Sequence, residues 1–357
     1  MKKIILAFDS FKGCMSAEDA CSAAANGIHS AWPEAEIVAL PMSDGGEGLV
    51  KCVEKSLHTK FRSIFVTGPI TDKVEATYTI DINSNTAYME MAAASGLMLV
   101  SENKRNPMVT TTYGVGEMIA DAISKGCKNI VMGIGGSATC DGGKGMVEAL
   151  RDCGLINSDI IKGIKFVVAC DVDNPLYGKN GAAYVFAPQK GATAAEVKIL
   201  DKRLRIFAHE TECLGLATSE AALKPGTGAA GGLGYALYTY LKAELKAGIE
   251  IMLDIANFDN TIAKADLVVT GEGKSDIQTM MGKVAQGVMK RAKKNNVPIW
   301  LLSGAIDDKE GVLTANFNLV KSINDGDSRP LPILLQRATA MKNIEKTISQ
   351  LCLNLPI

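Results

Sequence analysis

Apolar and polar residues follow two different patterns along this chain, and each pattern predicts its own kind of strand. Short runs of mainly apolar residues are typical of strands buried in a parallel sheet. Residues 61–91 instead alternate apolar and polar positions, which predicts antiparallel strands with one exposed face. Strands of the first kind are predicted at residues 3–8, 36–40, 129–132, 165–169, 265–270 and 298–302.

Helices are predicted in most of the intervals between these strands. Ser16 can cap a helix over residues 17–31, which Pro33 then ends. The regular exchange of strands and helices predicts an α/β fold. Further helices are predicted at residues 50–57, 110–124, 144–150, 194–209 and 284–294, through residue 247 after the glycine-rich stretch 226–234, and in the tail from residue 331.

The change of strand type suggests two domains. A chain of 357 residues is long for a single core, and a new pattern starts near residues 65–80. The strand–helix rhythm returns at residues 265–270, so the second domain reads as an insertion. We therefore expect a discontinuous Rossmann-like α/β domain from residues 1–75 plus 255–357, and an inserted α/β domain at residues 76–254.

Composition limits the partners. The formal net charge is −1 and no basic block occurs, which argues against nucleic acid or an anionic membrane surface. No apolar stretch approaches the length of a membrane span. The nine cysteines form no Cys-x-x-Cys pair, which is typical of free thiols in a reducing compartment. We expect a cytoplasmic protein with a small-molecule partner.

Glycine-rich loops follow several of the predicted strands. In an open α/β sheet, ligands bind beyond the carboxyl ends of the strands, where such loops meet. Glycines let the backbone approach an anion, while acids and lysines supply metal and phosphate contacts. Five junctions of this kind suggest an enzyme that handles phosphate; they lie at residues 9–13, 44–48, 133–145, 226–234 and 271–283.

Two of these loops have alternative interpretations. Residues 133–138 partly fit the dinucleotide pattern G-x-G-x-x-A, but Asp159 is the only acid near the expected distance, in a loop-like stretch. Anion binding by the same amides is favoured, and close packing that needs glycine is the other reading. For residues 226–234, phosphate binding and helix packing stay equally open. The 271–283 loop is no Walker A loop, because Val268 occupies the place of the required glycine.

Acidic residues suggest where a metal or a base could lie. Asp44 and Glu47, three apart at a strand end, suit a hydrated Mg²⁺ or substrate hydroxyls, or a polar loop with a capping acid. Asp171 follows a buried strand, where desolvation could raise its basicity. Asn174 and the proline after it would alone predict a turn there. The three histidines are far from every glycine loop, which argues against zinc or a Ser/His hydrolase.

Taken together, the chain resembles the glycerate kinase family over essentially its whole length. The resemblance implies ATP-dependent phosphorylation of D-glycerate to 2-phosphoglycerate with Mg²⁺, in a cleft between two α/β domains. Lys274 stands where the family usually has arginine, Cys140 where it has Asn or Thr, and Cys14 where it has Ser. The resemblance rests on residues 9–13, 44–48, 133–139, 141–143, 169–175, 228–234 and 271–283.

Roles are assigned to residues on the basis of this resemblance. Amides of Gly135, Gly136 and Ser137 are predicted to cradle phosphate, with Gly231 and Gly232 as support. Lys12 and Lys283 would neutralise phosphate or the glycerate carboxylate. Asp44 or Glu47 would hold Mg²⁺, and Asp171 is the first candidate for the base, Asp276 the second. The other predicted binding residues are Asp9, Ser10, Gly45, Gly46, Asp141, Asn174, Gly271, Glu272, Gln278 and Thr279, with Asp44 a binding residue as well.

Two rival functions are kept beside the kinase. The partial dinucleotide pattern at residues 133–138 would suit an NAD-dependent hydroxy-acid dehydrogenase. Two-domain α/β clefts also serve non-catalytic sensors of small molecules, although a sensor has no need of so many acids at strand ends. A homo-oligomer is left open.

Overall fold

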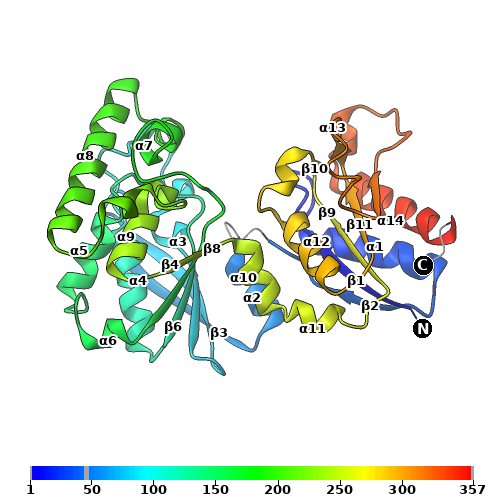
Figure 1. Ribbon diagram of the computed structural model, residues 1–357, viewed down its shortest axis with the longest axis horizontal. Coiled ribbons are helices and arrows are strands. Elements are labelled where there is room, and N and C mark those ends of the chain that lie inside the picture. The colour runs from blue at the N-terminus through cyan, green and yellow to red at the C-terminus, as the bar shows by residue number, and fades with distance from the viewer. Residues whose placement is uncertain (1, 44–47, 355–357) are drawn as a thin grey trace. The chain divides into compact units, whose positions relative to one another are not determined.

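The chain consists of two compact units. The computed structural model describes residues 2–43 and 48–354. Unit 1 comprises Met1–Asp44 and Ile249–Ile357, and unit 2 comprises Gly45–Gly248 (Figure 1). The domain boundaries predicted from the sequence lay instead between residues 75 and 76 and between residues 254 and 255. The first difference arises because strand β3 (Thr59–Thr67) pairs along its whole length with β4 (Lys73–Asp81), so both strands belong to unit 2.

Unit 1 has a parallel sheet of five strands within the described residues, in the order β13-β11-β9-β1-β2. Its central strands carry almost only apolar side chains, and β9 and β11 are buried throughout. The prediction of buried parallel strands is therefore confirmed for the strands at residues 3–8, 267–271 and 299–303. The strand at residues 36–39 is parallel but only partly buried, because it lies at the edge of the sheet. The sheet strands are β1 (Lys3–Phe8), β2 (Glu36–Ala39), β9 (Leu267–Gly271), β11 (Ile299–Ser303) and β13 (Leu319–Ser322), and β10 (Lys274–Ser275) pairs separately with β12 (Ala305–Ile306).

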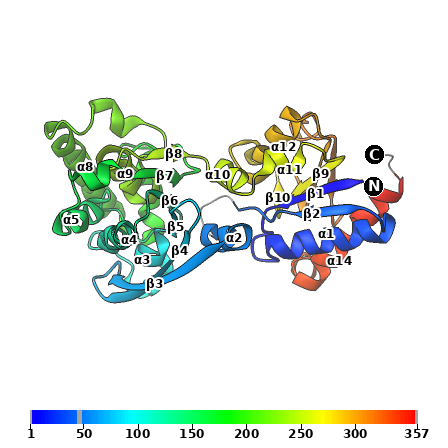
Figure 2. The same cartoon turned by 90° about the horizontal axis from the view of Figure 1, so that it is seen from below.

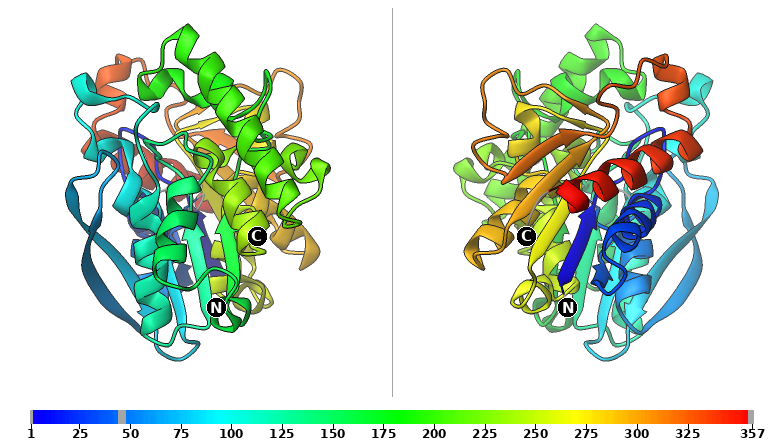
Figure 3. Two further views of the ribbon diagram at one scale, coloured as in Figure 1. Left: turned by 90° about the vertical axis from the view of Figure 1, so that its left-hand side faces the viewer. Right: turned by 90° about the vertical axis from the view of Figure 1, so that its right-hand side faces the viewer.

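Helices cover both faces of this sheet. Helices α1 (Ala17–Ala31) and α14 (Arg337–Asn354) pack together on one face, and α12 (Val284–Lys294) lies on the other (Figures 2 and 3). Ser16 caps α1 as predicted, since its Oγ accepts a hydrogen bond of 3.1 Å from the Asp19 amide. The remaining helices are α11 (Phe258–Ile262), α13 (Leu331–Leu334) and α10 (Gly248–Ile255), which starts at the last residue of unit 2.

The order of strands creates a switch point in unit 1. From β1 the chain passes through α1 to β2 on one side, and the next sheet strand, β9, pairs with the other side of β1. The connections that follow β1 and β9 therefore continue toward opposite sides and open a crevice at the ends of these two strands. In open α/β sheets this is the usual place for a ligand.

Unit 2 has a mixed sheet in the order β3-β4-β5-β6-β7-β8, counting the described strands. β3, β4 and β5 (Thr86–Glu90) are antiparallel, whereas β5, β6, β7 and β8 are parallel. The predicted change from parallel to antiparallel pairing is confirmed. The parallel strands after β5 are β6 (Asn129–Gly133), β7 (Lys165–Ala169) and β8 (Glu244–Lys246).

The helices predicted in unit 2 are present, although their ends differ, and three short helices at residues 92–95, 159–162 and 182–186 were not predicted. The helix predicted through residue 247 is wrong at its end: α9 stops at Tyr240, and Glu244–Lys246 forms β8. None of the described helices combines the length and apolarity needed to cross a membrane. The helices of unit 2 are α2 (Leu49–Ser56), α3 (Ala92–Ser95), α4 (Tyr113–Ser124), α5 (Lys144–Asp152), α6 (Asp159–Lys162), α7 (Ala182–Phe186), α8 (Ala194–Cys213) and α9 (Leu233–Tyr240).

Candidate functional site

Two carboxylates meet at the switch point of unit 1. Phe8 of β1 is paired with Gly271 of β9, so the next residues, Asp9 and Glu272, leave the sheet side by side. The amide of Asp9 continues the pairing by donating to the Gly271 carbonyl at 2.9 Å. Asp9 is 8% exposed and Glu272 is 7% exposed. Two carboxylates this well buried carry a large desolvation cost, which a cation or hydrogen-bond donors must offset.

Hydroxyl groups hold Glu272 in place. Ser275 Oγ and Thr279 Oγ1 both donate to Glu272 Oε1, at 3.0 and 2.6 Å. Ser275 Oγ also lies 2.7 Å from Ser303 Oγ of β11. Among the described residues no hydrogen-bond partner is seen for Oε2. Thr279, predicted to bind ligand directly, is buried and instead positions Glu272.

A pocket of about 450 Å³ opens beside these carboxylates. Its size lies in the usual range for small-molecule sites. It gathers Asp9, Ser10, Lys12, Glu272 and Lys283, which the sequence had predicted to bind ligand from two distant segments. The remaining lining residues were not predicted to bind ligand: Phe11, Cys14, Gly273, Lys274, Gly304, Ala305, Ile323, Asn324, Leu331, Leu334, Leu335 and Ala340.

Gly271 has a structural reason for being glycine. A Cβ there would lie 1.8 Å from the Leu302 carbonyl oxygen, because β9 and β11 are adjacent strands. Any side chain would therefore push β9 away from β11. Its predicted place in ligand binding is indirect, since it fixes where Glu272 leaves the strand.

Asp276 and Lys274 pair with each other rather than with Glu272. Lys274 Nζ lies 3.2 Å from Asp276 Oδ2, and Asp276 Oδ1 accepts the Gln278 amide at 2.9 Å. The Gln278 amide, and after it Lys274, hold the pKa of Asp276 below its ordinary value. A carboxylate with a lowered pKa is a weaker base. Lys274 lines the pocket of unit 1, whereas Asp276 and Gln278 do not.

The glycine loop after β6 presents unused backbone donors in unit 2. The loop is anchored by two hydrogen bonds, from Leu97 N to Gly136 O (2.8 Å) and from Ala138 N to Ser95 O (2.9 Å). Within the described residues, the amides of Gly135, Gly136 and Ser137 have no protein acceptor. Consecutive amides of this kind can form a site for an anion. The geometry suits the predicted phosphate cradle.

A buried lysine, which the sequence did not single out, supports this loop. Lys190 lies in the turn Pro188–Lys190 between α7 and α8 and is 3% exposed. Its Nζ donates to Ser137 Oγ at 2.6 Å and to the Thr139 carbonyl at 2.7 Å. Burial lowers the pKa of Lys190 to about 8. Nothing in the neighbouring sequence predicts that Lys190 is buried, because lysines are mostly exposed.

The surroundings of Gly231 and Gly232 bear on whether residues 226–234 bind phosphate or allow close packing, which the sequence left open. A Cβ on Gly231 would lie 2.0 Å from the Thr139 carbonyl oxygen, and one on Gly232 would lie 2.8 Å from Gly142 Cα. Gly231 O also accepts the Gly142 amide at 3.0 Å. These contacts favour the packing interpretation, in which the 228–234 segment braces the loop that follows β6.

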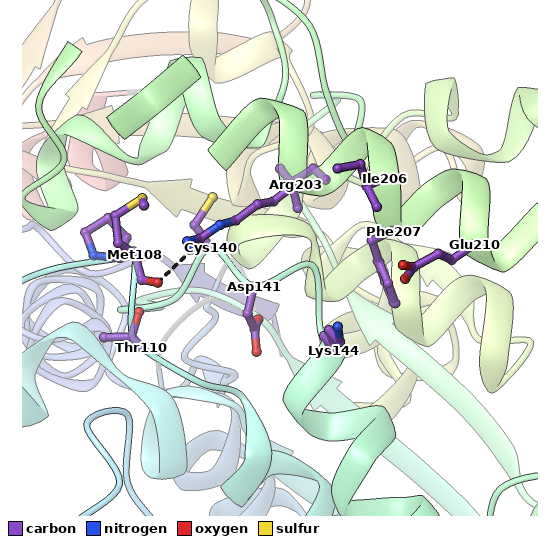
Figure 4. A pocket seen from close by; sticks show the side chains of 11 residues that line it. Met108, Thr110, Cys140, Asp141, Lys144, Arg203, Ile206, Phe207 and Glu210 are labelled. Carbon is purple, nitrogen blue, oxygen red and sulfur yellow. Dashed lines mark hydrogen bonds between the residues drawn. The ribbon is translucent and has the colours of Figure 1, made fainter. Parts of the chain in front are cut away.

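Asp141 organises the start of α5. Its carboxylate accepts four hydrogen bonds, from Thr112 N and Oγ1 (2.8 and 2.7 Å) and from the amides of Gly143 (3.0 Å) and Gly145 (3.2 Å). This full set of partners indicates a structural role. Asp141 also borders a second pocket, of about 360 Å³, in unit 2 (Figure 4).

This second pocket mixes charged and apolar side chains. Figure 4 shows Cys140, Lys144 and Glu210 around it, with Arg203 bonded to the Met108 carbonyl at 2.9 Å. Burial raises the pKa of the Cys140 thiol to about 11, so the thiol stays protonated at neutral pH. The pocket therefore offers no thiolate nucleophile.

Asp171 and Asn174 follow β7, where the sequence placed them. Asp171 is exposed, so the prediction that burial would raise its basicity is wrong. Its Oδ1 accepts a hydrogen bond from the Gly248 amide at 2.9 Å. Asn174 Nδ2 donates to the Asn180 carbonyl at 2.8 Å and so closes the predicted turn. The predicted residues Asp44, Gly45, Gly46 and Glu47 lie outside the described residues.

Replacing Lys190 by methionine should change how stability depends on pH. The pKa is about 8 in the folded chain and about 10.5 when unfolded. Between these values the unfolded chain binds the proton that the folded chain has lost, so wild-type stability gains up to about 1.4 kcal/mol per pH unit from this group. Cys140 and Asp141 are the ionisable neighbours and are unchanged in the variant.

The measurement is urea unfolding of wild type and Lys190→Met at pH 7.5 and 9.5. We expect the wild type to gain free energy of unfolding relative to the variant at the higher pH. A difference between the two proteins that stays constant with pH would contradict the lowered pKa.

The chain is similar to known proteins along nearly its whole length. The glycerate kinase family matches residues 4–159 and 156–354. Glycerate kinase of Bacillus subtilis (strain 168) is 43% identical over 349 residues, covering 91% of each chain. Glycerate 2-kinase of Escherichia coli (strain K12) is 40% identical over 376 residues, covering 97% of this chain and 98% of the relative.

A solved structure agrees with these matches. A crystal structure from Salmonella typhimurium LT2, assigned as a glycerate kinase 2, has a TM-score of 0.82 and 36% sequence identity. The two structures match over 99% of this chain and 97% of the Salmonella chain. Both units are therefore included in the similarity. The chain is a phosphotransferase and belongs to the glycerate kinase family.

Proposed function

We propose that this protein phosphorylates D-glycerate to 2-phosphoglycerate with ATP, by direct in-line transfer in a cleft between its two domains. The observation that carries the proposal is the pocket of unit 1, where two nearly buried carboxylates, Asp9 and Glu272, adjoin three lysines at the carboxyl ends of parallel strands. Phosphoryl transfer depends on positioning and on neutralising charge, and these residue types supply both.

Phosphate groups have two candidate partners in the chain. Lys12 and Lys283 line the pocket of unit 1 and carry the positive charge that a polyphosphate needs. The amides of Gly135, Gly136 and Ser137 in unit 2 can receive phosphate oxygens, and Lys190 keeps their loop in place. We propose that both sets act on the donor phosphates during transfer.

Mg²⁺ fits the carboxylates of the unit 1 pocket. Mg²⁺ is commonly bound by one or two carboxylates together with phosphate oxygens and water. Asp9 and Glu272 provide such a pair, with Glu272 Oε2 directed to no described partner. When bound, the ion would neutralise charge on the transferred phosphoryl group. Asp44 and Glu47 stay predicted ligands, and they lie outside the described residues.

Asp171 is proposed as the base that accepts the proton of the glycerate hydroxyl. It is exposed at the carboxyl end of β7, where a substrate can reach it. The other candidate, Asp276, has a lowered pKa and both of its oxygens engaged, with the Gln278 amide and with Lys274. Asp276 is therefore the weaker choice.

The compartment proposed is the cytoplasm. Within the described residues no disulfide joins any of the nine cysteines, which suits a reducing environment. The proposed partner is the small molecule D-glycerate.

The experiment incubates the purified chain with ATP and Mg²⁺, with and without D-glycerate, and follows ADP. We expect ADP only when D-glycerate is present. A second arm replaces ATP with NAD⁺ and follows absorbance of the reduced cofactor. Reduction of NAD⁺ would favour the dehydrogenase, and binding of glycerate without turnover would favour the sensor.

A further inference from the structure

The pocket of unit 1 has two chemically different sides. One side carries the charged residues Asp9, Lys12, Glu272, Lys274 and Lys283. The other side is apolar and comes from the end of β13 and from the α13–α14 segment. Its members are Ile323, Leu331, Leu334, Leu335 and Ala340.

Two of the three leucines on the apolar side are well exposed. Leu331 is 64% exposed and Leu335 is 47% exposed, although both line the pocket. When an apolar surface covers exposed leucines, the burial lowers the free energy of the complex and so favours binding. Something with an apolar face therefore fits this side.

Glycerate does not have such a face. Each of its three carbons carries oxygen, and the molecule is much smaller than a pocket of about 450 Å³. A nucleoside triphosphate, in contrast, joins a flat base with two apolar faces to a chain of anionic phosphates. Its two ends match the two sides of the pocket, with phosphates toward Lys12 and Lys283.

We propose that Leu331, Leu334 and Leu335, with Ile323, bind the nucleoside of the phosphoryl donor. The inference rests on the proposed function, because it names where that donor binds. The side chain of Asn324, the polar residue nearest in sequence, is engaged: its Nδ2 donates to the Gly304 carbonyl at 2.9 Å, and its Oδ1 accepts from Asn343 at 2.8 Å. Binding at this side therefore depends mainly on apolar contact.

The test uses Leu331→Ser and Leu335→Ser, with Leu353→Ser as the control. Leu353 is 69% exposed on α14 and does not line the pocket. Calorimetry measures the binding of ADP and of inorganic tripolyphosphate, which has no nucleoside. Loss of one leucine contact should weaken ADP binding about 5- to 30-fold. Tripolyphosphate binding should stay within about twofold, and the control should match wild type.

Kinetics gives a second readout. We expect KM for ATP to rise in both pocket variants while KM for D-glycerate stays nearly constant. Unchanged ADP binding, or equal weakening of ADP and tripolyphosphate, would overturn the inference. So would a shift in oligomeric state without a change in ADP binding, which would make the leucines a contact between copies. Wild type that binds ADP but never phosphorylates glycerate would instead count against the proposed function.

Discussion

Replacing Asp171 by asparagine is expected to lower kcat for glycerate phosphorylation by about two to four powers of ten, with a modest change in KM. Asparagine cannot accept the hydroxyl proton, but its carbonyl oxygen can still accept the Gly248 amide that Asp171 Oδ1 accepts at 2.9 Å. This hydrogen bond should therefore survive the substitution. Steady-state kinetics with varied D-glycerate measures the effect.

Asp173 offers a matched control for this prediction. It is exposed two residues further along the same segment, and no catalytic role is proposed for it. We expect Asp173→Asn to keep kcat within about threefold of wild type, as is usual for a group outside the chemistry. Near-normal turnover by Asp171→Asn would remove Asp171 from the role of base.

Replacing Gly231 by alanine is expected to lower the free energy of unfolding by about 3 kcal/mol or more. The new Cβ would lie 2.0 Å from the Thr139 carbonyl oxygen, so the 228–234 segment would have to move off the cradle loop. Gly231 also has a φ of +67°, a conformation that costs an L-residue about 1–2 kcal/mol. Because Thr139 O accepts from Lys190, the damage should reach the cradle and lower kcat as well.

Gly126→Ala separates the two causes. Gly126 has a φ of +86° in the same unit, but no atom lies within 4 Å of the position that a Cβ would take there. It should therefore show only the backbone cost, about 1–2 kcal/mol. Urea unfolding of both variants gives the comparison. Equal losses of free energy would contradict the packing role of Gly231.

Much of the fold was predictable because its signals are local. The capping box at Ser16 and the buried runs of β1 and β9 depend on residues close in sequence. The end of α9 did not follow its local preference. Residues 241–247 have helical composition, but Lys242 has a φ of +53° and the next residues pair with β7. Sheet pairing across a long sequence separation outweighed helix propensity there.

The site was predictable only where glycine and acid motifs mark it. Asp9 and Glu272 were predicted from motifs, and the strand register explains why they meet. Lys190 and Leu331 were missed because their importance depends on what folds against them. A lysine becomes buried, or a leucine lines a pocket, through contacts that sequence spacing does not encode.

Proton-coupled phosphorus NMR of the reaction mixture tests the proposed function most directly. The purified chain is incubated with ATP, Mg²⁺ and D-glycerate, and the phosphate esters are followed over time. Carbon 2 of glycerate bears a single hydrogen, so phosphate on its hydroxyl gives a doublet, whereas phosphate on the terminal hydroxyl gives a triplet. We expect a new doublet that grows together with the signals of ADP. A triplet, or the absence of any new ester, would contradict the proposed reaction.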